Sequence, residues 1–295
     1  MQNFYDVCFI FGSKGRFGNS FVDSLKGIEL EVLEYGTVEF NEGVENLVRH
    51  LKGNRRVLIV WCLGKGNSAN ATSLNREYHF LNELYYKLVH NRVPPTNSLF
   101  IYISTGGKMY GVNAGYVLEK SKILPVGLYG TQKRECEQLI YDKFEQRFFY
   151  LCVFRIANAY TLKLGNERPQ GFVDSCLSAV EFRESLKFTV NPNSRRQYAP
   201  HRDYVQAMLK IIGYSPESIH GTYNLAPNFT YSLNEIVDIF EKHFRTKIYV
   251  KPWEASDLIE DTVILESESI ERKIFFENWQ SLELNLKTSI DELQT

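Results

Sequence analysis

Residues 7–18 read VCFIFGSKGRFG, a short apolar run that leads directly into a turn with a glycine at every third position. The run has the length of a strand, and helical spacing begins at Phe17, so the turn joins a predicted strand to a predicted helix. Glycines in that context permit a tight turn and a close approach of a pyrophosphate, and the helix offers its first N–H groups to the phosphate charge. Gly12, Gly15 and Gly18 are therefore candidate dinucleotide-binding residues. The alternative is a glycine-rich turn that binds nothing.

Strand-sized apolar runs alternate with helically spaced segments through the first half of the chain. We expect strands at Val7 to Phe11, Leu30 to Leu33, Val57 to Cys62, Leu99 to Ile103 and Tyr150 to Phe154, and helices at Phe17 to Leu25, Gly43 to Leu51, Leu74 to Val89 and Thr131 to Phe144. Continuous runs of Val, Ile, Leu and Phe are typical of a parallel sheet that helices cover on both faces. The predicted fold class is α/β, with a Rossmann-like doubly wound parallel sheet.

The pattern changes to shorter, mixed elements after about Ile156. We predict a dinucleotide-binding Rossmann domain at residues 1–157 and a smaller C-terminal α/β lobe at residues 158–295 that binds substrate, with some segments of the lobe returning to the first domain. Ser232 begins a capping-box pattern before a predicted helix at Leu233 to Phe244, and a short helix is expected at Thr288 to Leu293.

The composition excludes several classes of protein. The 295 residues are 44% hydrophobic and 23% charged, and their net charge of −1 gives no overall attraction to nucleic acid or anionic lipid. No apolar run approaches the roughly 18 residues that cross a bilayer, and the N-terminus lacks a signal-peptide pattern. Five cysteines without a C-x-x-C pair and six histidines without ligand spacing predict neither disulfides nor a metal site. We therefore expect a cytoplasmic protein with a small-molecule partner, no nucleic acid and no membrane insertion.

The residues around the glycine turn carry conflicting signals about the dinucleotide. Glu34 ends the second predicted strand, where a carboxylate accepts hydrogen bonds from the adenosine ribose and repels the 2′-phosphate of NADP. Lys14 and Arg16 lie inside the turn, where either cation could pair with that phosphate. A third interpretation is that all three are solvated charges. The predicted cofactor is therefore NAD or NADP.

A tyrosine and a lysine lie four residues apart in LYGTQK, residues 128–133, at the start of a predicted helix. Residues at this spacing share one face of a helix. An ammonium group favours a nearby phenolate, so we expect Lys133 to bring the pKa of Tyr129 from about 10 towards the range of a general acid or base near neutral pH. The alternative is a partly buried tyrosine with a surface lysine.

Two hydroxyl residues, Ser104 and Thr105, follow the predicted strand at Leu99 to Ile103. They are expected at the carboxyl end of the sheet, where open α/β sheets bind ligands. A hydroxyl beside Tyr129 could hydrogen-bond the oxygen of an alcohol or ketone, whereas the simpler interpretation is a turn that ends a strand. The order of glycine turn, hydroxyl, tyrosine and lysine favours a catalytic site, with Tyr129, Lys133, Thr105 and Ser104 as its candidates.

Taken together, these motifs resemble those of the extended short-chain dehydrogenases/reductases, in the NAD(P)-dependent nucleotide-sugar epimerase, dehydratase and reductase group. The resemblance covers nearly the whole chain and includes Val60 to Leu63, Asn75, Phe154 to Asn158, Arg202 to Val205 and Gly221 to Leu225. It implies that Tyr129 exchanges a proton with a sugar oxygen that Thr105 also holds, and that Lys133 binds the nicotinamide ribose and tunes Tyr129. It also implies a place in nucleotide-sugar metabolism, such as the synthesis of polysaccharide precursors.

The resemblance implies substrate contacts in the second lobe as well. Asn158 resembles a residue that contacts the bound sugar or diphosphate, and Arg196 or Arg202 could bind the diphosphate in a bidentate pair. The alternative for the two arginines is a surface or interlobe salt bridge. A homodimer through the helices at Leu74 to Val89 and Thr131 to Phe144 is an option that the resemblance adds, although both helices could equally pack only within the monomer.

Three departures from the family pattern bear on the reaction. Gly106 and Gly107 stand where dehydratases carry an Asp-Glu pair that moves protons, which disfavours a dehydratase. The loop that follows is one residue longer than usual, so either Ser104 or Thr105 could be the functional hydroxyl. The segment from Tyr35 to Leu51 leaves little room for a third strand, as in the shorter ketoreductases. We therefore expect 4-keto reduction of a nucleotide-activated sugar; the alternatives are an epimerase that retains NAD and a non-catalytic dinucleotide-binding sensor or scaffold.

Overall fold

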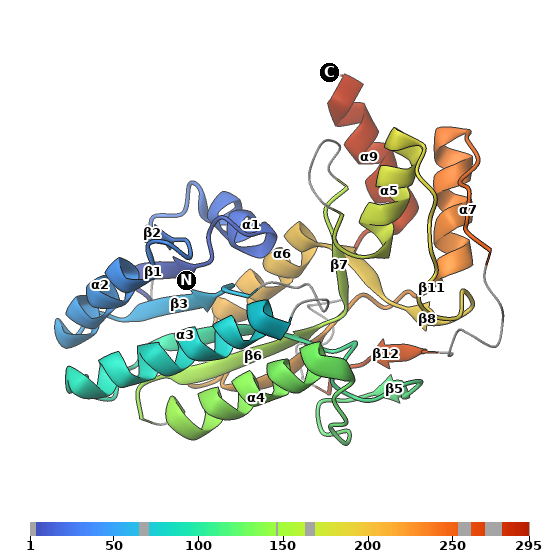
Figure 1. The fold of residues 1–295 in the computed structure, drawn as a ribbon. Coiled ribbons are helices and arrows are strands. Elements are labelled where there is room, and N and C mark those ends of the chain that lie inside the picture. The colour runs from blue at the N-terminus through green and yellow to red at the C-terminus, as the bar shows by residue number, and fades with distance from the viewer. Residues whose placement is uncertain are drawn as a thin grey trace.

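A six-stranded parallel sheet forms the centre of the protein (Figure 1). The structure is a computed structural model that describes residues 4–64, 71–145, 147–162, 169–252, 261–268 and 279–294. The strands lie in the order β10-β6-β4-β3-β1-β2, with bounds β1 Val7–Phe11, β2 Glu31–Tyr35, β3 Val57–Trp61, β4 Leu99–Thr105, β6 Tyr150–Ile156 and β10 Gly221–Leu225. The predicted α/β class with a doubly wound parallel sheet is confirmed.

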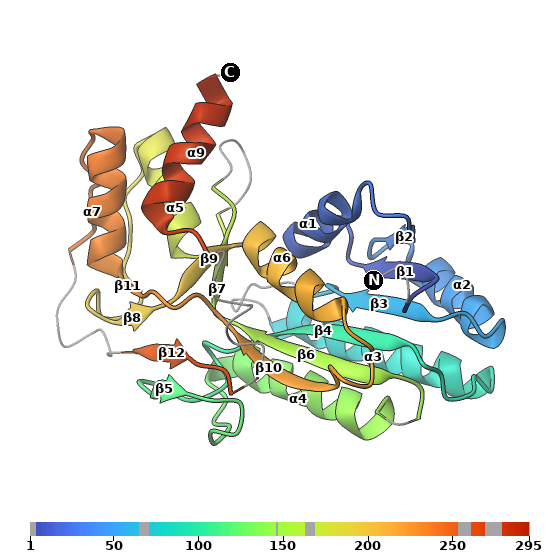
Figure 2. The ribbon, with the colours of Figure 1, turned by 180° about the vertical axis from the view of Figure 1, so that it is seen from behind.

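Helices cover both faces of this sheet (Figures 1 and 2). One face packs against α2 Phe40–Lys52, α3 Ala71–His90 and α4 Gly127–Lys143, and the other against α1 Arg16–Leu25 and α6 His201–Ile212. Successive residues of a strand point to opposite faces. In β1, accordingly, Phe9 and Phe11 join the first core, while Cys8 and Ile10 join the second. Because both faces are covered, the strand needs the continuous apolar run that its sequence has.

The sequence after β6 builds most of a smaller lobe beyond the carboxyl ends of the main strands (Figure 2). Its elements are β7 Asn158–Tyr160, α5 Phe172–Phe182, β8 Arg195–Arg196, β9 Tyr198–Pro200, β11 Tyr231–Ser232, α7 Leu233–Phe244, β12 Val263–Leu265 and α9 Leu282–Gln294. Ser232 and Glu235 form the predicted capping box at the start of α7.

Segments cross between the two parts of the molecule. β10 and α6 return to the main sheet and its helices, whereas β5 Gly115–Val117, from the first half of the chain, joins the small sheet of β11, β8 and β12. The proposed division between residues 157 and 158 therefore divides the sequence, and segments from each side of it join the other part of the molecule.

Two element boundaries matter for the site, and one of them differs from expectation. β2 is an edge strand and α2 follows it directly, so the segment before α2 contains no further strand of the sheet, as its length predicted. Helix α4 begins at Gly127 rather than Thr131, with Val126 at its N-cap and no side-chain cap there. The usual start signal is absent from the sequence, which explains the late prediction. No helix in the part of the chain that the structure describes is long and apolar enough to cross a membrane.

Candidate active site

The glycine turn packs so closely that side chains are excluded at two of its three glycines. A Cβ on Gly12, whose φ is +92°, would lie 2.6 Å from the carbonyl carbon of Cys62. A Cβ on Gly18 would lie 2.1 Å from the carbonyl oxygen of Gly12. Both distances are shorter than real Cβ contacts, so the turn between β1 and α1 requires glycine at both positions.

The start of α1 is suited to an anion. Gly15 is the N-cap residue, and no side chain caps the helix there. The first N–H groups of a helix lack partners within the helix, and the helix dipole favours negative charge at this end. The close-packed turn, the uncapped helix and the position at the carboxyl end of β1 together fit the pyrophosphate of a dinucleotide. Gly12, Gly15 and Gly18 would hold it there.

The two cations of the turn have different surroundings. Lys14 is exposed and its Nζ lies 2.6 Å from the carboxylate of Glu39, which also accepts the Gly36 N–H. The hydrogen bond from Lys14 is the main cause that holds the pKa of Glu39 below its ordinary value. Arg16 is largely buried and pairs with Asp174 of α5, in the smaller lobe. Arg16 therefore connects the turn to that lobe, while Lys14 stays at the surface.

Glu34 does not lie at the last position of its strand. It pairs in register with Ile10, two residues before the glycine turn, and its side chain is exposed. The residue that follows it, Tyr35, is buried and accepts the N–H of Gly12 through its carbonyl. Two acidic side chains that the sequence did not reveal approach the turn instead: Glu39 through Lys14, and Asp174 through Arg16.

Thr105, Tyr129 and Lys133 come together at the carboxyl end of β4. Thr105 is the last residue of β4, and Tyr129 and Lys133 lie in the first two turns of α4. The Thr105 hydroxyl lies close enough to the Tyr129 phenol to lower its pKa. The helix approaches closely because residue 130 is glycine: a Cβ there would lie 2.3 Å from the carbonyl oxygen of Lys108.

The net effect on Tyr129 is opposite to the expected one. Burial raises the pKa of Tyr129 most strongly, Lys133 and the Thr105 hydroxyl lower it, and Glu77 raises it again. The balance lies above the ordinary phenol value. The sequence correctly predicted that Lys133 lowers this pKa. It did not reveal that burial and Glu77 raise it. Tyr129 is therefore protonated at neutral pH.

Ser104 faces a different set of partners from Thr105. Its hydroxyl donates to Glu137 Oε1 at 2.5 Å, inside the protein. Arg155 of β6 donates to both oxygens of the same carboxylate, at 3.1 and 2.7 Å, and to Tyr110 at 2.9 Å. Ser104 is thus part of a buried polar network, while Thr105 contacts Tyr129. Of the two hydroxyls between which the sequence left the choice open, the geometry favours Thr105.

Glu77 is the principal residue of this cluster that sequence reasoning missed. Its carboxylate lies 2.9 Å from Lys133 Nζ, and both side chains are largely buried. A signal did exist: the buried residues of α3 recur at 77, 81, 84 and 88, and the other three are leucines. A carboxylate in an otherwise apolar helical stripe needs a buried partner.

The three candidate substrate residues of the second lobe have protein partners in the structure. Asn158 donates its side-chain N–H to the carbonyl of Gln197 at 3.0 Å, which fastens β7 to β9. The guanidinium of Arg196 pairs with the carboxylate of Asp261 and donates to the main-chain carbonyl of Asp261 at 3.1 Å. Arg202 donates to Asn285 at 3.0 Å and remains half exposed. Arg202 therefore keeps the most freedom to bind a ligand.

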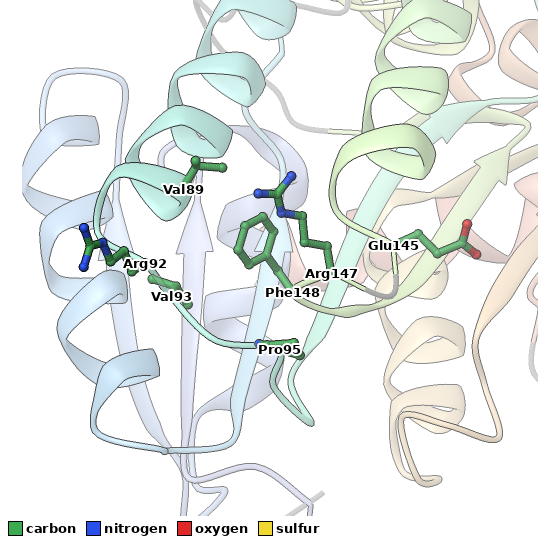
Figure 3. Close-up of a pocket in the computed structure, with 7 residues that line it drawn as sticks. All are labelled: Val89, Arg92, Val93, Pro95, Glu145, Arg147 and Phe148. Carbon is green, nitrogen blue, oxygen red and sulfur yellow. The ribbon is translucent and has the colours of Figure 1, made fainter.

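A separate surface pocket of about 620 Å³ lies at the far ends of α3 and α4 (Figure 3). Its lining residues are Val89, Arg92, Val93, Pro95, Glu145, Arg147 and Phe148. Val89 is 12 residues after Glu77 on α3, a distance of about 18 Å along the helix axis. The pocket is therefore not part of the Tyr129 cluster.

Four of the five cysteines are buried and all five are free. No group of three or more His, Cys, Asp or Glu residues suited to a metal ion occurs among the described residues. The cluster at the end of β4 accordingly consists of a phenol, an ammonium, a carboxylate and a hydroxyl, which together can position and transfer a proton.

Solved structures with this fold include sugar-nucleotide enzymes of two kinds. The UDP-glucose 4-epimerase of Thermotoga maritima, solved with UDP-glucose, is 19% identical, with 97% of this chain and 98% of that chain covered and a TM-score of 0.76. The UDP-glucose 4-epimerase of Thermus thermophilus, solved with NAD, is 15% identical, with 97% and 98% covered and a TM-score of 0.78. The dTDP-4-dehydrorhamnose reductase of Bacillus anthracis, solved with NADP, is 18% identical, with 98% and 99% covered and a TM-score of 0.73.

Sequence comparison identifies the family. No curated protein sequence matches the chain. The model of the NAD dependent epimerase/dehydratase family matches residues 46–226, which include Glu77, Thr105, Tyr129 and Lys133 but begin after the glycine turn. This match confirms the predicted resemblance. The chain belongs to the NAD dependent epimerase/dehydratase family, a family of enzymes that use a nicotinamide dinucleotide.

Proposed function

We propose that the protein reduces the 4-keto group of a nucleotide-activated sugar, with Tyr129 as the general acid. The observation that carries the proposal is the position of the Tyr129 phenol near Thr105 and Lys133 at the carboxyl end of β4. A neutral phenol can give a proton to a ketone oxygen at once, whereas it must first lose its proton before it can accept one from a hydroxyl. The cluster in this state is therefore prepared for reduction.

The bound dinucleotide supplies the hydride for the carbonyl carbon. Thr105 holds the substrate oxygen beside Tyr129, and the Tyr129 O–H bond breaks as the new O–H bond of the product alcohol forms. The phenolate that remains is stabilised by the nearby Lys133 ammonium and then regains a proton from solvent. Lys133 Nζ has three N–H donors, of which two bind Glu77 and the carbonyl of Ile103 at 3.0 Å. The third can hold a ribose hydroxyl of the dinucleotide.

Two further observations support reduction. Residues after Thr105 are Gly106 and Gly107, which have no carboxylate with which to move protons in a water elimination. β2 is the edge strand of a six-stranded sheet, as the comparison with the shorter ketoreductases predicted. The sugar would bind between the main sheet and the smaller lobe, where Asn158, Arg196 and Arg202 are the proposed contacts.

An epimerase that retains NAD is the second candidate. It is supported by the fold shared with the two UDP-glucose 4-epimerases. Both reactions would use the same Tyr129 and Lys133. They differ in cofactor use, because an epimerase regenerates its NAD in each turnover while a reductase consumes one reduced dinucleotide per product.

The test is a binding titration of cofactor-stripped protein with NAD⁺, NADH, NADP⁺ and NADPH, followed by turnover of a panel of nucleotide sugars and their 4-keto forms. We expect net consumption of a reduced dinucleotide with a 4-keto substrate. Tyr129→Phe should lower that rate by about 10²-fold or more while dinucleotide affinity is retained. Tight NAD binding with an inverted sugar centre and no net redox change would establish the epimerase instead. Failure to bind any dinucleotide would refute both.

We also propose a homodimer and a cytoplasmic location. Helices α3 and α4 pack side by side on one face of the sheet, and Tyr86 of α3 is an exposed aromatic on that layer. Five free thiols suit a reducing compartment. Sedimentation equilibrium with a Tyr86→Lys variant would test the dimer, which a monomeric wild type at micromolar concentration would exclude.

A further inference from the structure

Glu77 is a buried carboxylate that the chemistry of proton transfer does not itself require. It belongs to α3, its side chain is largely buried, and its Oε1 lies 2.9 Å from Lys133 Nζ. The ammonium also lies 4.8 Å from the ring centre of Tyr102 and donates to the carbonyl of Ile103. Glu77 is thus the residue that places a full negative charge against the lysine of the proposed site.

We propose that Glu77 is a positioning residue for the reaction described above: it holds the Lys133 ammonium in place and offsets its charge, so that Tyr129 receives its substrate as the neutral phenol. This inference rests on the proposed function, and it assigns Glu77 a role in the direction of reduction, in which Tyr129 starts as the neutral phenol. With Glu77 in place, the phenol of Tyr129 stays protonated to a higher pH.

The charges of the cluster explain the effect. Glu77 and Lys133 together carry no net charge, so Tyr129 faces a neutral pair inside the protein instead of an isolated ammonium. Without Glu77, the ammonium would act on the phenol unopposed, and an opposite charge within a few ångströms typically lowers an acid's pKa by about 1–3 units. Glu77 raises the pKa of Tyr129, in the direction that this argument requires, while Lys133 lowers it.

Other groups around the phenol are weaker candidates for the same role. The titratable and polar groups that face Tyr129 or Lys133 are Lys133 and Cys136 from α4, Glu77 from α3, Tyr102 and Thr105 from β4, and Cys62 after β3. Burial raises the pKa of both thiols and of Tyr102 well above neutral, so these three remain uncharged. Among these groups, Glu77 is the one carboxylic acid.

The backbone of the loop after β3 keeps Glu77 in its place. A Cβ on Gly64 would lie 2.7 Å from Glu77 Oε2, so the carboxylate lies directly against this glycine. An alanine at residue 64 would push the carboxylate away without removing its charge. Gly64 has no positive φ and the displaced atom is the end of a flexible side chain, so the substitution should be tolerated by the fold.

The decisive measurement is the titration of Tyr129 in the protein without added substrate, by ¹³Cζ-tyrosine NMR, with its signal assigned from its loss in Tyr129→Phe. Glu77→Gln should lower the titration midpoint by about 1 pH unit or more. Gly64→Ala should move it in the same direction by less. Glu83→Gln, on the same helix about 9 Å farther along its axis, is the control for a simple change of net charge and should leave it in place.

Kinetics give an independent readout. Glu77→Gln should move the alkaline limb of the reduction rate to lower pH and, by the same amount, extend alcohol oxidation to lower pH, whereas a purely structural defect would lower both rates at every pH. A Tyr129 midpoint that stays unchanged in both Glu77→Gln and Gly64→Ala would overturn the inference. Because the NMR titration needs no turnover, it would still decide the role of Glu77 if the proposed reduction proved wrong.

Discussion

Two ion pairs in the glycine turn should respond very differently to the same kind of substitution. Asp174→Asn removes the charge opposite Arg16, and Glu39→Gln removes the charge opposite Lys14. The side chains of Arg16 and Asp174 are 15% and 7% exposed, whereas those of Lys14 and Glu39 are 72% and 35% exposed. The first pair joins α1 to the smaller lobe, and the second joins the turn after β1 to the N-cap residue of α2 at the surface.

The magnitude follows from burial. Loss of one partner from a buried ion pair costs about 3–5 kcal/mol, because the remaining charge loses the opposite charge beside it in a poorly solvated place. Asp174 also accepts the N–H of Thr161 at 3.0 Å, and an asparagine has one carbonyl oxygen with which to serve both Thr161 and Arg16. With a urea m-value near 3 kcal/mol/M, this loss lowers the unfolding midpoint by about 1 M or more. The exposed pair is screened by solvent, so Glu39→Gln should leave the midpoint where it is.

The assay is urea unfolding of the cofactor-stripped protein, followed by far-UV circular dichroism and by tryptophan fluorescence. Wild type, Asp174→Asn and Glu39→Gln should be compared at two salt concentrations, since only an exposed pair weakens with ionic strength. Equal midpoints for the two variants would refute the reasoning. So would a large loss in Glu39→Gln, because it would mean that exposure does not decide the value of these pairs.

Three further outcomes follow from the structure. Ser104→Ala should lower the free energy of unfolding by about 1–3 kcal/mol with little change in kcat, because the buried carboxylate of Glu137 loses a donor. Thr105→Ala should lower kcat with little change in stability. The reverse pattern would contradict the separate roles of the two hydroxyls. Burial lowers the pKa of His201 to about 4, so the unfolded chain binds a proton below pH 6.5 that the folded protein does not bind until pH 4. The free energy of unfolding should therefore fall by about 3 kcal/mol as the pH is lowered from 6.5 to 4. In His201→Gln, the free energy of unfolding measured with urea should depend less on pH over this range. An unchanged pH dependence would exclude His201 as the cause. Lys14→Ala should weaken NADPH binding more than NADH binding, and Glu34→Ala should alter that preference less, as measured by fluorescence titration; a larger effect of Glu34 would restore it as the residue that selects the cofactor.

Much of the fold could be predicted because its signals are local. The strand at Val7–Phe11 and the helix at Leu233–Phe244 have the predicted bounds, since a continuous apolar run and a capping box each lie within a few residues of sequence. Helix α4 was predicted four residues late because Gly127 begins it without a polar cap. Its start depends on the packing of Gly130 against the Lys108 carbonyl, which is a contact between distant residues.

The candidate site divides in the same way. Tyr129 and Lys133 were identified by their spacing on one helix, and Thr105 by its position after a strand. The partners that set their chemistry come from elsewhere: Glu77 lies 56 residues from Lys133 in sequence. The pKa of Tyr129 was predicted to fall and instead rises, because burial and Glu77 outweigh the one interaction that the sequence revealed.

The end of β4 lies between two buried ion pairs that differ in one respect. Glu137 and Arg155 are joined by two hydrogen bonds, and Ser104 and Tyr110 bind the same pair, so the polar atoms of this network hold one another in a fixed arrangement. Such a network can fix the end of a strand, but it has no reason to exchange protons.

Among the residues that the structure describes, the Lys133 ammonium donates to Glu77 and to the carbonyl of Ile103, and it has three N–H groups with which to donate. The two adjacent residues at the end of β4 therefore have different roles. Ser104 donates to Glu137 in the network with Arg155, whereas Thr105 lies near the phenol of Tyr129, beside Lys133. A catalytic group needs a rigid support and an incomplete set of partners, because the missing partner is the ligand. In this structure the network around Glu137 is the rigid support, and the Lys133 ammonium is the group that a ligand can complete.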